Sequence, residues 1–158
     1  MIRGIHHTAI STPDIDRAIA FYRDLLGFEV VVNGAWPRGV ESVDTLIGLK
    51  GSAARMAMLR KGNAMLEFFE FESPVPAPGN PQRPVNDHGL THICFDVTDL
   101  RSEYTRLKDA GMSFHSEPLG SGDSFSVYGR DPDGNVIELV EFGRPDHPMA
   151  LSLDEPGG

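Results

Sequence analysis

Two carboxylates and two histidines have the residue types and the spacing of a chemical site. Glu67 and Glu138 each interrupt a strongly apolar segment, where a charge costs several kcal/mol unless it is paired or coordinated. His7 and His92 lie 85 residues apart (92 minus 7), in two segments of similar sequence. A single strand histidine is more often a hydrogen-bonded structural residue, so only the repeated arrangement indicates a metal site.

The first half of the chain predicts a strand, a helix and three further strands. Residues 5–11 predict a strand that ends near Pro13, where Thr12 or Asp14 is suited to cap a helix. Apolar residues recur at helical spacing from Asp14 to Leu26, and Gly27 stands where a glycine ends a helix. The pattern then predicts a strand over 28–32, mostly loop over 33–53, and a hairpin of strands 54–60 and 64–71.

A proline-rich linker over 73–89 separates this half from a second half with the same order of elements. Its five prolines favour extended backbone over helix or sheet. The elements predicted after it are a strand over 90–97, a helix over 99–110 closed by Gly111, a strand near 113–117, and a hairpin of 124–129 and 135–142. Residues 131–134 (DPDG) suit the hairpin turn.

This repeat predicts an α+β fold made of two tandem βαβββ modules. Each module is too small to bury its own sheet face alone, so we expect the two to pack within one domain over residues 1–158. The parts of this domain are module 1 (4–72), the linker (73–89), module 2 (90–143) and a surface tail (144–158).

Charge and composition exclude several classes of protein. A formal net charge of -9 repels nucleic acid. The longest apolar runs fall far short of the roughly 18 to 20 residues that a membrane span needs. The first residues lack the pattern of a secretory signal, and the single cysteine, Cys94, excludes an intrachain disulfide. We therefore expect a cytoplasmic protein that binds neither nucleic acid nor membrane.

Four segments resemble the vicinal oxygen chelate superfamily, which includes glyoxalase I, methylmalonyl-CoA epimerase, extradiol dioxygenases and antibiotic-resistance proteins. The segments are IHHTAI (5–10), AIAFYRDLLGF (18–28), GLTHICFDV (89–97) and RDPDGNVIELVE (130–141), and the resemblance spans roughly residues 4–143. It implies that the two modules form a curved mixed sheet around a metal cleft. The family's metal ligands lie on the first and fourth strands of each module.

Carried over position by position, the resemblance implies that His7, Glu67, His92 and Glu138 hold a divalent metal. Imidazole and carboxylate together suit Zn or Ni first, with Co, Mn and Fe as further choices. Four protein ligands leave two octahedral positions for water or substrate oxygens, enough to polarise a carbonyl. Glu67 or Glu138 is then the candidate general base.

The first hypothesis for the function is a metal-dependent lyase or isomerase that abstracts a proton beside the carbonyl of a small compound. One alternative is an Fe(II)- or Mn-dependent extradiol-type dioxygenase, which uses two histidines and one carboxylate and therefore requires Glu67 to turn away. Another is a non-catalytic drug-binding or resistance protein. The linker is long enough for modules to pair within one chain or between two, and we expect a homodimer.

Other polar residues have weaker claims to a function. We expect substrate contacts in loop 33–53, from Trp36 and Arg38 and from the nearby Arg55. Alternation along a strand predicts that His6 points away from His7, on the outer face. The remaining candidates are interpreted as surface or packing residues: His88, His115, His147, Cys94, Glu70 and Glu141.

Overall fold

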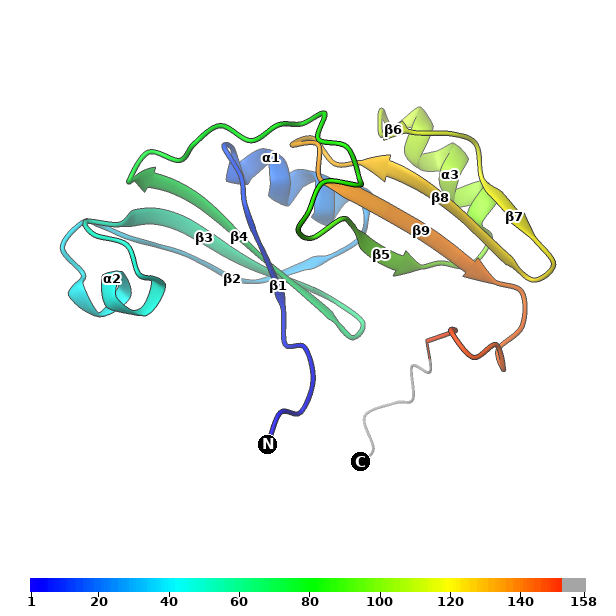
Figure 1. Ribbon diagram of the computed structural model, residues 1–158, viewed down its shortest axis with the longest axis horizontal. Helices are drawn as coiled ribbons and strands as arrows, with labels where there is room; N and C mark the ends of the chain where they lie inside the picture. The colour runs from blue at the N-terminus through cyan, green and yellow to red at the C-terminus, as the bar shows by residue number, and fades with distance from the viewer. Residues whose placement is uncertain (152–158) are drawn as a thin grey trace. The chain divides into compact units, whose positions relative to one another are not determined.

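The computed structural model describes residues 1–151 and divides the chain into two compact units (Figure 1). The first unit is Met1–Gly79 and the second begins at Asn80, so the division falls within the predicted proline-rich linker. Each unit combines at least one helix with a sheet of mixed parallel and antiparallel strands, as the α+β prediction requires. The helices within residues 1–151 are too short or too polar to traverse a lipid bilayer.

The first unit has the predicted βαβββ order with one added helix. Its sheet has the order β1-β4-β3-β2, in which β1 runs parallel to β4 and the other pairs are antiparallel. Its elements are β1 (Thr8–Ser11), α1 (Ile15–Ala20), η1 (Phe21–Leu25), β2 (Glu29–Trp36), α2 (Glu41–Ile47), β3 (Ala53–Lys61) and β4 (Ala64–Ser73).

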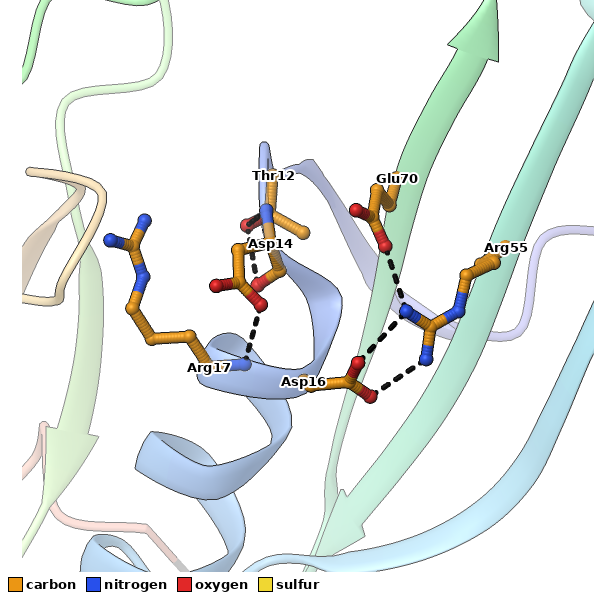
Figure 2. A network of polar contacts seen from close by, with 6 residues as sticks. All are labelled: Thr12, Asp14, Asp16, Arg17, Arg55 and Glu70. Atoms are coloured by element: carbon orange, nitrogen blue, oxygen red, sulfur yellow. Dashed lines mark hydrogen bonds and ion pairs between the residues drawn. The ribbon is translucent and has the colours of Figure 1, made fainter.

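The first helix begins and ends at the residues that the sequence indicates. Asp14 is the N-cap, and its Oδ1 accepts the backbone N–H of Arg17 at 2.9 Å (Figure 2). Thr12 supports this cap, because its hydroxyl accepts the N–H of Asp14 at 3.2 Å. The α-helix changes at Phe21 into the π-helical turn η1, and Gly27 follows in the left-handed conformation at φ 74°.

The core of the first unit lies between α1 and one face of its sheet. Tyr22 is fully buried, with its ring centroid 4.8 Å from that of Phe68 on β4. Leu66 and Phe68 are 2% and 1% exposed. Because successive strand residues point to opposite faces, Glu67 between them lies on the face away from α1.

Truncating Phe68 is expected to destabilise the first unit strongly. Phe68→Ala removes a buried ring from the contact with Tyr22, which costs about 3–5 kcal/mol in similar cores. Urea denaturation followed by circular dichroism measures this change in the free energy of unfolding. The half-buried Phe69 provides a control on the other face, and a Phe68→Ala cost no larger than that of Phe69→Ala would contradict this core assignment.

The second unit repeats the strand order of the first. Its sheet has the order β5-β9-β8-β6, with β5 parallel to β9, and β7 pairs with β8. Its elements are β5 (Ile93–Asp96), α3 (Leu100–Asp109), β6 (Ser113–Phe114), β7 (Leu119–Ser121), β8 (Ser124–Arg130) and β9 (Val136–Phe142). The repeat predicted from the sequence is therefore present in the strand pairing as well.

The helix α3 contacts β8 and β9 and covers one face of the second sheet (Figure 1). Ile137 and Leu139 are 0% and 1% exposed, and Glu138 between them lies on the opposite face. The hairpin turn before β9 packs against the linker. A Cβ on Gly134, which has φ 88°, would lie 2.3 Å from the backbone of Pro81, so this position requires glycine.

Three local expectations were wrong. Strand β2 continues through Trp36, and residues 33–53 also contain α2, which is short, has no buried residue and lies in a segment rich in Gly and Pro. The strands β1 and β5 begin at Thr8 and Ile93, later than expected. The structure adds the three-residue strand β7 at the edge of β8. Part of the predicted tail, residues 152–158, lies outside the described residues.

Candidate metal centre

The first unit brings His7 and Glu67 together. His7 directly precedes β1, and Glu67 lies in β4, the parallel neighbour of β1. His7 Nε2 is 3.2 Å from Glu67 Oε2. The Glu67 side chain is 14% exposed and that of His7 is 36% exposed, so the pair is shielded on the carboxylate side and open on the imidazole side.

The second unit repeats this pair with His92 and Glu138. His92 directly precedes β5, and Glu138 lies in β9, the parallel neighbour of β5. The distance from His92 Nε2 to Glu138 Oε2 is 3.0 Å. Each unit therefore supplies one imidazole and one carboxylate at equivalent positions, on the sheet face that its helix leaves uncovered.

The residue that precedes each of these histidines lies within hydrogen-bond distance of its Nδ1 atom. His6 Nδ1 lies 2.8 Å from His7 Nδ1, and Thr91 Oγ1 lies 2.8 Å from His92 Nδ1. A hydrogen bond at Nδ1 leaves Nε2 free to act as the ligand atom. The prediction that His6 points away from His7 was wrong, because both residues precede β1 and strand alternation does not apply to them.

The donor set and its spacing fit a divalent cation. Imidazole nitrogen and carboxylate oxygen bind such ions at about 2.1 Å, so two ligand atoms at right angles lie about 3.0 Å apart. Both His–Glu distances, 3.2 and 3.0 Å, have this size. Within residues 1–151, His, Cys, Asp and Glu side chains do not gather in a ready-made group of three. Each unit by itself thus presents two donors.

Polar groups surround Glu138. Cys94 of β5 and Tyr128 of β8 are its partners across the two strand pairs. Burial, and then the charge of Glu138, raise the pKa of the Cys94 thiol to about 12, and the same two causes raise the pKa of Tyr128. The ring of Tyr128 is also 5.0 Å from that of His92.

Sequence reasoning missed Tyr128, although a signal for it existed. The predicted hairpin around residues 131–134 pairs Tyr128 with Glu138 once its register is counted outward from the turn. Cys94 was expected on the same side as His92, as an inert packing residue. It does face this group, and its raised pKa keeps it a thiol near neutral pH.

An aromatic cluster lies on the Glu67 face of the first unit. Trp36, at the end of β2, packs against Phe69 and Phe71 with ring centroids 5.8 and 6.1 Å away. Phe69 and Phe71 alternate with Glu70 and so share the face of Glu67. The sequence predicted that Trp36 is positioned for substrate contact, and the structure places it on this face rather than in a loop.

A hydrogen-bonded chain ties this cluster to α2. Trp36 Nε1 donates to Ser52 Oγ at 3.0 Å, and Ser52 Oγ donates to Asp44 Oδ1 at 2.5 Å. The backbone N–H groups of Gly51 and Ser52 also donate to Asp44, at 2.6 and 2.8 Å. These bonds, with the Ser52 hydroxyl first, hold the pKa of Asp44 below its ordinary value.

The lowered pKa of Asp44 predicts an acid transition that Trp36 reports. Above about pH 4, the ordinary pKa range of Asp, the charged Asp44 carboxylate stabilises the folded contacts with Ser52 fully. This stabilisation is lost as the pH falls through the lowered pKa of Asp44. We expect the fluorescence of Trp36, the single tryptophan, to change in this acidic range. Asp44→Asn should lack the transition and Asp87→Asn should keep it. An unchanged titration in Asp44→Asn would contradict the assignment.

The structure does not bring Arg55 to the Glu67 face. Figure 2 shows its guanidinium between Asp16 of α1 and Glu70 of β4, at 2.7 and 3.1 Å. This bridge fastens the helix to the sheet on the face away from Glu67, and the position does not favour the expected contact of Arg55 with substrate. Arg38 lies exposed in the turn before α2.

The remaining candidates have structural contacts. Glu141 is not merely solvated, because its carboxylate accepts the N–H groups of Asp99 and Leu100 at the start of α3. His147 stacks on Phe142 with centroids 4.4 Å apart. Burial, and then the charge of Arg130, lower the pKa of His115. His88 is exposed, as expected.

Comparisons with known proteins identify one family. A family model described as the Glyoxalase/Bleomycin resistance protein/Dioxygenase superfamily matches residues 4–139. A 2-epi-5-epi-valiolone epimerase from Actinomyces sp is 30% identical over 173 positions, which cover 98% of this chain and 90% of that protein. The ethylmalonyl-CoA/methylmalonyl-CoA epimerase of Cereibacter sphaeroides is 31% identical over 153 positions, which cover 89% and 99%.

A solved structure shares the fold. The glyoxalase family protein APC24694 from Bacillus cereus superposes with a TM-score of 0.82 at 22% identity, and the match covers 90% of this chain and 95% of that one. The matched regions extend across both units.

Proposed function

Because the chain belongs to the Glyoxalase/Bleomycin resistance protein/Dioxygenase superfamily, we propose that it is a divalent-metal-dependent lyase or isomerase acting on a small carbonyl compound. The observation that carries this proposal is the repeated His–Glu pair, at 3.2 Å in one unit and 3.0 Å in the other. In both units the pair lies on the face that the helix leaves uncovered, where a carboxylate and an imidazole can receive a ligand.

In this proposal His7, Glu67, His92 and Glu138 bind the metal. Zn or Ni suits the donors best, followed by Co, Mn and Fe. A bound divalent ion would act as a Lewis acid toward a substrate carbonyl. The chain's own contribution is to orient the imidazoles through His6 and Thr91, and to place a carboxylate beside the acidic C–H of the substrate.

Both epimerase relatives support proton transfer at carbon rather than oxygen chemistry. Their names describe reactions that invert a carbon centre, which requires removal and return of a proton or an equivalent step. Glu67 points toward His7 instead of turning away, so the two-histidine, one-carboxylate arrangement of the dioxygenase alternative is disfavoured. We expect a homodimer, which light scattering after size-exclusion chromatography tests.

Solvent exchange tests the reaction class without knowledge of the substrate. The metal-loaded protein is incubated in D₂O with three kinds of carbonyl compound: α-branched acyl-CoA thioesters, hemithioacetals of 2-oxoaldehydes, and cyclic polyhydroxy ketones. We expect ¹H NMR to show loss of the C–H signal beside one of these carbonyls. Absence of exchange in all three, with oxygen consumed on a catechol, would contradict the proposal in favour of a dioxygenase.

A further inference from the structure

A small open space, here called the Gly34 gap, interrupts the Glu67 face of the first sheet. Gly34 of β2 pairs with Met56 of β3, and both positions lie on this face. A Cβ added at Gly34 would meet Met56 Sδ at 3.8 Å, and in the described part of the chain no further atom beyond its chain neighbours lies within 4 Å of it. Val32 and Trp36, two residues away on either side, border the gap along β2.

The side chains around the gap are uncharged and partly open to solvent. Val32 is 51% exposed, and Met56 and Trp36 are half-buried. The one polar atom of the Trp36 side chain is already engaged, because Nε1 donates to Ser52 Oγ at 3.0 Å. These side chains offer no strong hydrogen bond to a hydroxyl-rich group, which would lose its bonds to water there. The gap is therefore suited to an apolar group.

Trp36 is held in one orientation by groups that lie off this face. Ser52 is fully buried, and its hydroxyl both accepts from Trp36 and donates to Asp44 Oδ1 at 2.5 Å. Asp44 is fixed in turn by the backbone N–H groups of Gly51 and Ser52. A side chain that is already ordered loses less conformational entropy when a ligand packs against it. Trp36 is thus a preorganised wall of the gap.

The gap also lies within reach of the proposed metal ligand Glu67. Glu67 pairs with Met58, and Met58 pairs with Val32, so one row of side chains joins Glu67 to the border of the gap. With strands about 4.8 Å apart and successive rows about 7 Å apart, Gly34 is roughly 12 Å from Glu67. A substrate whose carbonyl is beside Glu67 can carry a ring into the gap on a short chain.

Building on the proposed function, we propose that the Gly34 gap binds an apolar ring of the substrate, with Trp36 as the specificity-determining residue and Ser52 as its positioning residue. The ring lies between Trp36 and Val32 and against the thioether of Met56, a favourable neighbour for an aromatic ring. The substrate is then a carbonyl compound that carries an aromatic or other flat apolar ring on a short hydrocarbon spacer. Cyclic polyhydroxy ketones are disfavoured.

Two ketones with the same carbonyl end test this inference: 6-phenylhexan-2-one carries the ring and hexan-2-one lacks it. Ligand-observed NMR measures the Kd of each for the full chain, with and without added Zn²⁺, and fluorescence of the single tryptophan reports contact with Trp36. The variants are Trp36→Ala, Ser52→Ala and Gly34→Val, which fills the gap with a residue favoured in strands. Thr45→Ala removes an exposed hydroxyl on α2 and is the matched control for Ser52→Ala. Thermal melts confirm that each variant is folded.

We expect wild type to bind the phenyl ketone about 10-fold more tightly than hexan-2-one. Gly34→Val should abolish this preference, Trp36→Ala and Ser52→Ala should each reduce it about 5-fold, and Thr45→Ala should keep it. The ratio of the two affinities is the readout, because a general structural defect would weaken the binding of both ketones alike.

Equal affinities in wild type, or a preference that survives Gly34→Val, would overturn the proposal. So would absence of ring binding together with dissociation of a dimer in Trp36→Ala, measured by light scattering, because this face would then belong to a second copy of the chain. The proposed reaction is read separately by proton exchange in D₂O. If wild type prefers the phenyl ketone but exchanges no proton of any carbonyl compound, that reaction fails and the ring site stands. Exchange with no preference between the two ketones would support the reaction and overturn the ring site.

Discussion

Glu67→Gln is expected to lower the rate of proton exchange by about 10²- to 10⁴-fold, the usual contribution of a general base. The amide has nearly the same shape but cannot accept the proton. Glu138→Gln should lower the rate as well, because it weakens the metal site. Both effects are measured as the first-order loss of the C–H signal in D₂O at saturating metal.

Glu70→Gln is the matched control for this experiment. Glu70 lies three residues along the same strand, but on the opposite face, where it pairs with Arg55 at 3.1 Å. An exposed pair of this kind contributes little to stability, so the variant should keep the wild-type rate. Equal rates in wild type and Glu67→Gln, at full metal occupancy, would show that Glu67 is not the base.

Removal of the metal is expected to abolish activity and to lower thermal stability. A ligand that binds only the folded state stabilises it by about 2.7 kcal/mol at a concentration 100 times its Kd. Protein dialysed against a chelator should therefore lose exchange activity and melt at a lower temperature. Adding back Zn²⁺ or Ni²⁺ should restore both properties, as differential scanning fluorimetry and the NMR assay can measure.

Ca²⁺ provides a control for nonspecific ion effects, because it prefers six to eight oxygen ligands rather than imidazole. It should restore neither property. Full activity after exhaustive chelation, with the metal content confirmed to be negligible, would contradict a metal-dependent reaction.

The repeated modules were predictable because the same local signals occur twice. Asp14 and Asp99 cap helices that follow a first strand, and Gly27 and Gly111 follow those helices with positive φ. These signals act over a few residues, so the sequence displays them directly. The exposed helix α2 carries a weaker signal, because it is too short to establish a clear period and its apolar residues Leu46 and Ile47 face solvent.

The His–Glu pairs were predictable from the repeat and the family resemblance, but their surroundings were not. Tyr128 reaches Glu138 through the register of the β8–β9 hairpin, which depends on where the turn closes. Arg55 was named only for its nearness to loop 33–53, and the β3–β4 register that pairs it with Glu70 was not available from that position alone. Contacts across strands are set by pairing, and composition does not reveal pairing.

Elemental analysis of protein purified without added metal tests the four-ligand site most directly. Wild type is compared with the double variant His7→Ala, His92→Ala and with His88→Ala, which removes an exposed histidine elsewhere. We predict near-stoichiometric Zn, Ni, Co, Mn or Fe in wild type and in His88→Ala, and none in the double variant. Wild type that remains free of metal after incubation with each ion would contradict the site, as would equal metal in the double variant.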